Sequence, residues 1–309
     1  MIPAAAFAGE YHGHRPEHLA ALRAAFGDRP IVYLAGDSTL DNKFWLARAP
    51  TVPATNGVEA LLAPPRLRPD VAAALNAALA HAHSPLVALN CAVEESTLAG
   101  RAAAPRAADA FVRAHARARD VLVVSAGGND VVLAPAARTV AALGALLGCA
   151  SARALADGSA RGLATLRRLF RDELAAYVDY LCGGPEGGPG TVIVCFPYFP
   201  EELGTDDSWA DTALWAMGYD SRPEALQRVM RAVFAQATAR VAAPPPARTL
   251  YLPLFDVLVA RAGAGDYVAR VEPSAAGGAK IAAAIIAALA AAGDARARGG
   301  AGLGEGLED

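Results

Sequence analysis

Five short runs of apolar, mostly β-branched residues are spaced along the chain, and they constrain the fold more than any other feature. The runs are residues 30–35, 85–90, 120–126, 191–197 and 249–254. Longer segments with helical periodicity separate them, at 16–26, 68–82, 106–118, within 135–181, 222–242 and 274–292. Apolar strands that alternate with helices are typical of a parallel sheet covered by helices on both faces. We therefore expect an α/β fold built on a five-stranded parallel sheet.

The length and the patterning favour one domain. The chain has 309 residues, of which 54% are hydrophobic, so it can bury a sizeable core. It contains no internal repeat, and the glycine-proline segment 182–190 reads as a loop within the alternation of helices and strands. The last residues lack apolar periodicity. We predict a single domain over residues 1–292 and a disordered tail over 293–309.

Charge and hydropathy exclude several classes of partner. The net charge is −3 and only 19% of residues are charged, which gives no electrostatic case for nucleic acid or an acidic membrane surface. No window offers the roughly 18 uncharged apolar residues of a membrane span. The N-terminus lacks the basic region and the long apolar run of a signal peptide. We expect a soluble protein of the cytoplasm or an organelle that acts on a small molecule, and we leave its oligomeric state open.

The four cysteines show no metal-binding or redox spacing. They are Cys91, Cys149, Cys182 and Cys195, each in an apolar segment and none in a Cys-x-x-Cys pair. Four cysteines in a chain of this size are too few for a disulfide framework. We predict buried free thiols, which suit a reducing compartment.

Polar residues gather where the predicted strands end. In open parallel sheets, sites form at the carboxyl ends of the strands. The first strand runs into Gly36-Asp37-Ser38, the second into Asn90 followed by Glu94 and Glu95, and the third into Gly127-Gly128-Asn129-Asp130. This order and placement predict a site at one edge of the sheet.

These motifs resemble the SGNH (GDSL-type) hydrolases over about residues 30–292. Gly-Asp-Ser alone is a weak pattern, but here Gly-x-Asn-Asp follows about 90 residues later on the matching strand. Members of that family are three-layer α/β/α esterases, lipases, deacetylases and thioesterases. The resemblance implies a flavodoxin-like α/β/α sandwich and a serine hydrolase of the esterase or lipase class, acting on an acyl ester without a cofactor.

The resemblance also implies roles for individual residues. Ser38 is the nucleophile, held on a strand-to-helix turn at the N-terminus of a helix, where negative charge is favoured. The oxyanion of the tetrahedral intermediate would be stabilised by the N–H of Ser38, the N–H of Ala92 and the side-chain amide of Asn129. The family has two glycines in this motif. Ala92 takes the place of the first and Glu95 the place of the second.

The last family motif departs from the usual pattern. The family carries Asp-x-x-His shortly before its final helix, and Pro273, Ser274 and Gly277 fit the residues after that histidine. This alignment puts Glu272 in the place of the histidine and Ala269 in the place of the aspartate. No histidine follows His115 in the chain. The usual general base is therefore missing.

Three interpretations of this departure stay open. In the first, Glu272 is the base, which requires burial or a neighbouring acid because a glutamate of pKa about 4.3 is a weak base; Asp256 or Asp266 would be its partner. In the second, the protein is a pseudoenzyme that binds a ligand or another protein. In the third, it is a lyase or transferase that uses the acids Asp37, Asp41, Glu94, Glu95, Asp130 and Glu272.

Further residues are predicted to line the substrate pocket. The segment 208–220 contributes Trp209 and Trp215, whose rings suit a roof over an apolar pocket, and Tyr198 lies nearby. The polar members of the predicted pocket are Asp37, Asn90, Glu94, Glu95 and Asp130. Each motif also has a structural interpretation: Ser38 as a helix cap, Asn129 as a turn residue, Glu272 as an acid before a helix.

Three histidines lie close together near the N-terminus. His12, His14 and His18 have a spacing that suggests a metal site, but nothing else in the sequence supports one, and we predict no metal. A polar segment before the first helix is the simpler interpretation. An alternative is that this segment folds over the site and supplies a histidine.

Overall fold

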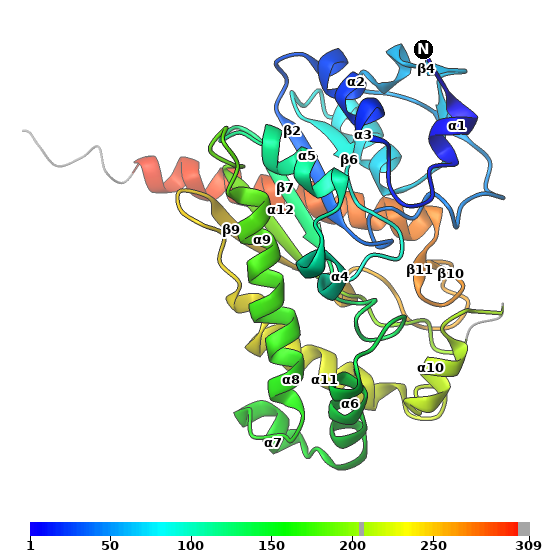
Figure 1. Ribbon diagram of the computed structural model, residues 1–309, viewed down its shortest axis with the longest axis vertical. Helices are drawn as coiled ribbons and strands as arrows, with labels where there is room; N and C mark the ends of the chain where they lie inside the picture. Colours follow the sequence, from blue (N-terminus) through cyan, green and yellow to red (C-terminus); the bar gives the residue numbers. More distant parts are fainter. Residues whose placement is uncertain (204–206, 302–309) are drawn as a thin grey trace, which may run out of the picture.

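A five-stranded parallel sheet with the order β6-β2-β7-β8-β9 forms the centre of the computed structural model, which describes residues 1–203 and 207–301 (Figure 1). The strands are β2 (Ile31–Gly36), β6 (Val87–Asn90), β7 (Val121–Ser125), β8 (Thr191–Phe196) and β9 (Arg248–Pro253). Each lies within two residues of its predicted bounds. All four neighbouring pairs run parallel. The predicted sheet is confirmed.

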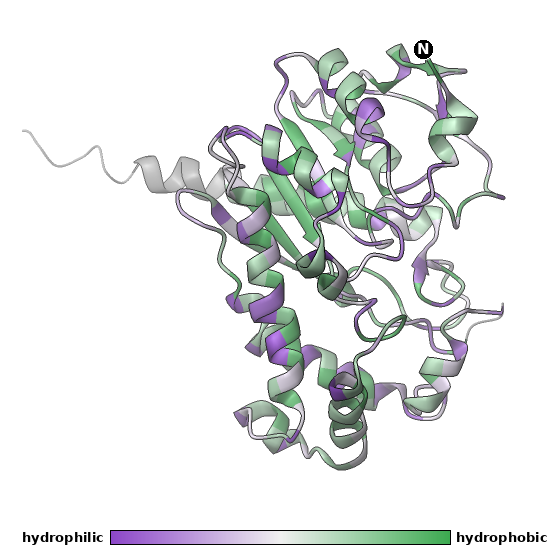
Figure 2. Ribbon diagram, viewed as in Figure 1, coloured by the Kyte–Doolittle hydropathy of each residue, from purple (hydrophilic) through white to green (hydrophobic). Residues whose placement is uncertain are grey.

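Alternate residues of the strands face two separate cores. Tyr33 and Leu122 belong to one core and Leu34 and Val123 to the other, as the two-residue period of a strand requires. Helices α2 (Pro16–Phe26), α5 (Ala107–His115) and α9 (Leu174–Cys182) cover the first face, and α3 (Val71–His81) and α12 (Ala275–Ala301) cover the second. In Figure 2 the strands are hydrophobic along their length. The three-layer α/β/α sandwich is therefore confirmed.

A second group of helices lies at one end of the molecule (Figure 1). The predicted helical region 135–181 divides into α6 (Ala137–Cys149), α7 (Ala152–Asp157), α8 (Leu163–Arg167), a π-helical turn (Arg168–Glu173) and α9. Helix α11 (Pro223–Gln236) packs against α6, α7 and α8, and α10 (Asp211–Ala216) precedes it in the chain. This group builds one wall of the site described below.

The remaining elements are too short to show periodicity in the sequence. They include α1 (Ala4–Ala8), α4 (Leu98–Ala103) and short 3-10 turns at Val58–Ala60, Thr238–Arg240 and Leu254–Asp256. Two-residue strands pair β1 (Ile2–Pro3) with β4 (Leu62–Ala63), β3 (Val52–Pro53) with β5 (Arg66–Leu67), and β10 (Tyr267–Val268) with β11 (Glu272–Pro273). The last pair carries Glu272.

Helix α12 differs from the sequence expectation in two ways. It continues to Ala301, beyond the predicted domain end at residue 292, and residues 302–309 of the predicted tail lie outside the described residues. Its part from Ala275 to Gly293 is also long and apolar enough to cross a membrane by length and composition, contrary to the window prediction. Core helices of soluble proteins meet the same criterion. In the structure this part packs on α3 and β9, with Ile281 and Ile285 fully buried.

All four cysteines are free thiols. Cys91, Cys182 and Cys195 are buried as predicted, and burial raises the pKa of each thiol. Cys149, at the end of α6, is exposed, which the apolar segment around it did not predict.

Candidate active site

The turn after β2 places Ser38 at the carboxyl edge of the sheet. Gly36 has φ +126°, and a Cβ there would lie 1.7 Å from the carbonyl oxygen of Ser125 on β7, so this position requires glycine. The N–H of Asp37 donates to the same oxygen at 2.9 Å, and Asp37 Oδ1 accepts from the N–H of Thr39 at 3.1 Å. These bonds fix the backbone on both sides of Ser38.

No helix follows Ser38, so the predicted strand-to-helix turn is wrong. The N–H groups of Leu40 and Asp41 both donate to the carbonyl oxygen of Asp37 at 3.1 Å, which closes a single turn. Residues 41–51, all of them described, continue as turns and irregular chain. A helix macrodipole therefore does not act on Ser38, and its environment depends on individual neighbours.

The turn after β7 brings Asn129 to the same place. Gly127 has φ +106°, and a Cβ there would lie 2.9 Å from the ring of Phe170. The side-chain amide of Asn129 donates one hydrogen to the carbonyl oxygen of Ser96 at 3.1 Å and retains a second N–H. Ser38 and Asn129 line the same two cavities. The predicted convergence of these two distant segments is present in the structure.

Glu272 on β11 completes the group beside Ser38. It is 1% exposed, and its Oε1 accepts a hydrogen bond from Trp209 Nε1 at 3.2 Å. Its Oε2 has no hydrogen-bond partner among the described residues. The Ser38 hydroxyl lies near enough to act on Glu272 and lower its pKa against the effect of burial. A serine hydroxyl thus faces a buried carboxyl at the position that the sequence assigned to the base.

Burial controls the protonation of this carboxyl. It raises the pKa of Glu272 well above its ordinary value, and the nearby Glu94 and Asp37 raise it further against the opposing effects of Ser38 and Trp209. Burial also raises the pKa of Glu94 to about 8, although Trp45 donates to Glu94 Oε1 at 2.9 Å. Asp37 follows the same pattern, with burial raising its pKa to about 6. The site therefore holds protonatable carboxyls that titrate near or above neutral pH.

An apolar cavity of about 110 Å³ opens on one side of Ser38. Its polar lining consists of Asp37, Ser38, Thr39, Asn129 and Glu272, all at one end. The rest of the wall is apolar and comes mainly from the second group of helices and the end of β8: Val131, Val132, Leu143, Leu166, Phe170, Phe196, Leu214, Met217, Leu226, Val229, Met230 and Val233. Such a wall suits a hydrocarbon chain.

A second cavity of about 140 Å³ opens on the other side and has a different character. It shares Ser38, Asn129, Trp209 and Glu272 with the apolar cavity. Its other lining residues are Tyr11, Trp45, Glu94, Glu95 and Leu133. The predicted pocket residues Glu94, Glu95 and Trp209 are thus found here, next to the serine.

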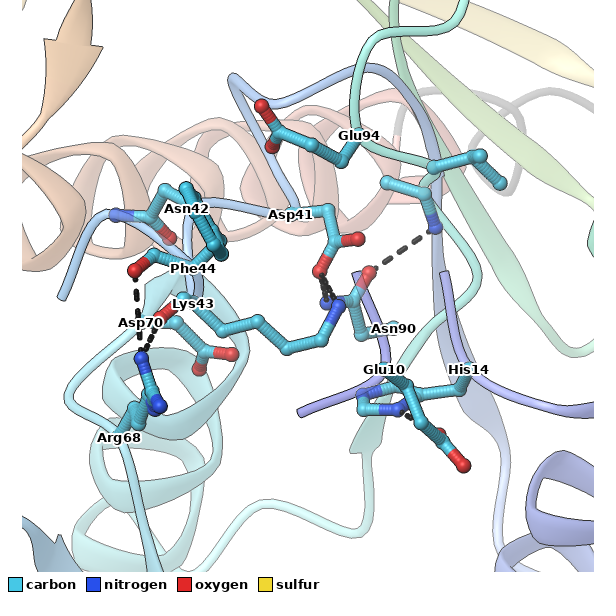
Figure 3. A network of polar contacts seen from close by, with 12 residues as sticks. Glu10, His14, Asp41, Asn42, Lys43, Phe44, Arg68, Asp70, Asn90 and Glu94 are labelled. Carbon is cyan, nitrogen blue, oxygen red and sulfur yellow. Dashed lines mark hydrogen bonds and ion pairs between the residues drawn. The ribbon is translucent and has the colours of Figure 1, made fainter. Parts of the chain in front are cut away.

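A buried polar network lies near Glu94, which lines this second cavity (Figure 3). Asp41 is fully buried, and its Oδ1 accepts from Lys43 Nζ at 2.5 Å and from Asn90 Nδ2 at 2.9 Å. Asn90 Oδ1 in turn accepts the N–H of Ala92 at 3.0 Å. Asn90 therefore lines neither cavity and holds the chain after β6 in place.

This network corrects the prediction for Ala92. Its N–H is already donated to Asn90, and Ala92 is fully buried away from both cavities, so it has no free donor for an oxyanion. Glu95, three residues later, has φ +58°, the left-handed region that favours glycine. Its N–H has no acceptor among the described residues, and Glu95 lines the cavity that Ser38 lines.

Two other predicted pocket residues lie outside the cavities. The carboxylate of Asp130 accepts the N–H groups of Leu98 and Ala99 at 2.8 and 3.0 Å, and it anchors the start of α4 instead of touching a ligand. Trp215 is 72% exposed on the outer side of α10. Tyr198 does line the apolar cavity, and its hydroxyl donates to the carbonyl oxygen of Val271, which precedes Glu272.

Neither acid that was proposed as a partner of Glu272 contacts it. Asp256 is bound to Arg231 at 3.1 Å at the surface. Asp266 accepts from Lys280 Nζ at 2.7 Å and from the N–H of Val259 at 2.8 Å. The acids that act on Glu272 are Glu94 and Asp37.

The N-terminal segment folds over the site, but it contributes a tyrosine there and not the histidine considered in the sequence analysis. Tyr11 lines the second cavity, and its pKa is raised by burial and by the carboxyls of Glu95, Glu94 and Glu272. His14 is buried against Phe7 and bonded to Glu10 at 2.7 Å, away from both cavities. Tyr11 and Trp45 could not be predicted from the sequence, because neither belongs to a periodic segment or a motif.

Within residues 1–203 and 207–301, no group of three or more His, Cys, Asp or Glu side chains is arranged to hold a metal ion. His18 instead lies 2.6 Å from Glu10 Oε1, and His12 is exposed.

Comparisons with known proteins give only distant likenesses. No protein-family model matches the chain. No curated protein matches it either. Among solved structures, it is similar to an extracellular lipase from Streptomyces rimosus (13% identity, 84% of this chain and 99% of that one, TM-score 0.42) and to phospholipase A1 from Streptomyces albidoflavus NA297 (11%, 84% and 99%, TM-score 0.43). It is also similar to an acetyl xylan esterase from Geobacillus stearothermophilus (16%, 83% and 93%, TM-score 0.41). At these TM-scores the function has to be inferred from the site of this chain.

Proposed function

We propose that this protein is an SGNH-type serine hydrolase that cleaves carboxylic esters, with Ser38 as nucleophile and Glu272 as general base. The observation that carries the proposal is the buried Glu272 carboxyl, which lines the same cavities as Ser38 and Asn129 and whose Oε2 has no hydrogen-bond partner among the described residues. A base must be within reach of the proton that it removes and must have a pKa near the working pH. Burial raises the pKa of Glu272 well above that of an exposed glutamate, which makes its carboxylate a stronger base.

The chemistry follows from this arrangement. Ionised Glu272 accepts the hydroxyl proton while Ser38 Oγ attacks the carbonyl carbon of the ester, and the carbonyl oxygen becomes an oxyanion. Asn129 Nδ2 donates to this oxyanion, together with the N–H of Ser38 and, in place of Ala92, the N–H of Glu95. The intermediate collapses when Glu272 returns the proton to the departing alcohol. Water then attacks the acyl-serine by the same path and releases the carboxylic acid.

The apolar cavity gives the acyl group its place. It begins at Ser38 and runs between β8 and the helices α6, α8 and α11, so an acyl chain attached to Ser38 would lie along its apolar wall. Transfer of each methylene from water into such a wall favours binding by about 0.8 kcal/mol. We therefore assign esters of medium-length acyl chains as substrates.

A fluorophosphonate probe tests the nucleophile. It should label the wild-type protein at Ser38, located by peptide mass spectrometry, and should leave Ser38→Ala unlabelled. The Ser221→Ala protein, which changes an exposed serine that lines neither cavity, should label like the wild type. If the wild-type protein stays unlabelled while it is folded, the hydrolase proposal fails and a protein that only binds ligands in this pocket takes its place.

A further inference from the structure

The second cavity combines acids and aromatic rings in a way that hydrolysis alone does not require. Three glutamates and three large aromatic side chains line it: Tyr11, Trp45, Glu94, Glu95, Trp209 and Glu272. No lysine or arginine contributes to its wall. The nearest positive charge that acts on Glu94 is Lys43, and its ammonium is held by Asp41 at 2.5 Å. The cavity is thus acidic with no internal counter-ion.

Two of the glutamates are held in the same way. Glu94 is 3% exposed and accepts at Oε1 from the indole N–H of Trp45, and Glu272 is 1% exposed and accepts at Oε1 from the indole N–H of Trp209. In each, Oε2 is buried with no hydrogen-bond partner among the described residues. A buried carboxyl oxygen without a hydrogen-bond partner is costly, so a ligand that forms hydrogen bonds with these two groups would stabilise the folded protein.

The lining selects among possible ligands. Burial favours the protonated forms of Glu94 and Glu272, and an anion in the cavity would favour them further, whereas a cation would favour the ionised carboxylates. The described residues offer no metal-binding arrangement of three such side chains. A protonated amine supplies a positive charge that favours the ionised carboxylates, N–H donors for their oxygens, and a cation beside the aromatic side chains that line the cavity.

We propose that the second cavity binds the ammonium group of the substrate, and that the substrate is an ester of an amino alcohol whose nitrogen carries at least one N–H. This inference rests on the proposed hydrolase function. The acyl chain occupies the apolar cavity, the scissile carbonyl lies at Ser38 between the two, and the amino alcohol fills the acidic cavity. Hydrolysis consumes one water and yields a carboxylic acid and the free amino alcohol.

Binding to an inactive protein tests the site without catalysis. In the Ser38→Ala protein, tryptophan fluorescence should report binding of protonated dimethylaminoethanol, because Trp45 and Trp209 are two of the three tryptophans in the chain. Choline should bind about tenfold more weakly because it lacks the N–H, and the uncharged dimethylbutanol weaker still. The added change Glu94→Gln should weaken dimethylaminoethanol binding about tenfold or more.

Several outcomes of this titration would overturn the inference. One is equal binding of the three alcohols or tighter binding of choline than of dimethylaminoethanol. Another is an unchanged dissociation constant of dimethylaminoethanol in the Glu94→Gln protein. A third is displacement of dimethylaminoethanol by millimolar Mg²⁺ or Ca²⁺. The control is Glu186→Gln, in the loop before β8 at the opposite edge of the sheet, where the glutamate makes only an exposed ion pair with Arg117. It should bind all three alcohols as the parent protein does.

Turnover separates this inference from the proposed function. Wild-type kcat/KM should fall in the order dimethylaminoethyl, trimethylammonioethyl and dimethylbutyl butyrate, with a ratio of about tenfold or more between the first and the last. In the Glu94→Gln protein this ratio should approach one. If all three esters stay intact while dimethylaminoethanol binds, the hydrolase proposal fails and the amine site stands. If all three are cleaved equally, the amine site fails and the hydrolase proposal stands.

Discussion

On one side of Ser38 the cavity wall consists of leucine, valine, methionine and phenylalanine side chains, and on the other side it consists of glutamates and indole rings. The first wall comes mainly from the second group of helices and the end of β8. The second comes from turns after β2 and β6 and from the N-terminal segment. Both walls include Ser38, Asn129, Trp209 and Glu272. This contrast suggests a division of labour in which one side holds the acyl group, the other the alcohol, and the shared residues carry out the reaction.

The shared boundary should be the most sensitive part of the site. Glu272→Gln keeps the size of the side chain and its bond to Trp209 but cannot accept a proton, and positioned general bases contribute roughly 10²- to 10⁴-fold. We expect kcat/KM for p-nitrophenyl butyrate to fall by that factor. Glu186→Gln is the matched control and should stay at the wild-type value. Unchanged turnover in Glu272→Gln would remove the carboxylate from the mechanism.

The apolar side should control chain length. Val229 on α11 is 2% exposed and lines the cavity, so Val229→Phe should fill it and lower kcat/KM for octanoate esters about tenfold relative to acetate esters. The change also overpacks the core, at about 1–3 kcal/mol of stability. The ratio of the two substrates is therefore the informative quantity. Val140→Phe, at a 55% exposed position of α6 outside the cavity, should leave that ratio unchanged.

The acidic side should make the folded state sensitive to pH. A carboxyl whose pKa is higher in the folded than in the unfolded chain binds its proton more tightly when folded, so stability falls as pH rises between the two values. The pKa values of Asp37 and Asp70 are raised to about 6, that of Glu94 to about 8, and that of Glu272 well above its ordinary value, in each case mainly by burial. We expect the Tm to fall by several degrees between about pH 5 and pH 8.

The same experiment identifies the responsible groups. Buried His14 has a lowered pKa, so it acts in the opposite direction as the pH rises through its ordinary value. Glu94→Gln removes one raised carboxyl and should flatten the fall in Tm measured by calorimetry. A Tm that rises steadily from pH 5 to pH 8 in the wild-type protein would mean that these carboxyls are ionised in the folded state.

The smallest expected effect concerns a residue that positions Glu272. The Tyr198 hydroxyl donates to the carbonyl oxygen of Val271, next to Glu272 in the chain. Tyr198→Phe should lower kcat about threefold to tenfold with little change in KM, because the loss of one such bond costs about 1 kcal/mol. An equal loss of kcat with a large rise in KM would instead place Tyr198 in substrate binding.

Much of the fold and part of the site follow from the sequence. All five sheet strands were predicted within two residues, because buried parallel strands are continuous apolar runs between turn residues. The meeting of Ser38 and Asn129 follows from the rule that strand ends share one edge of the sheet, whereas the place of Glu272 beside them was implied by the family resemblance.

The errors occur where side-chain contacts decide the outcome. Ala92 lost its predicted role because the Asn90 amide oxygen takes its N–H, and nothing in the local sequence shows that bond. Asp130 was predicted to line the pocket, but its carboxylate accepts the first N–H groups of α4. Tyr11 and Trp45 reach the acidic cavity through irregular chain, whose path depends on the whole fold.

The rate of fluorophosphonate labelling at Ser38, followed against pH in the wild-type and Glu272→Gln proteins, tests the pairing of this hydroxyl with this carboxyl most directly. We expect wild-type labelling to accelerate as the pH rises and Glu272 ionises, and labelling of Glu272→Gln to be at least about a hundredfold slower with no such rise. Equal labelling rates and equal pH profiles in the two proteins would contradict the account.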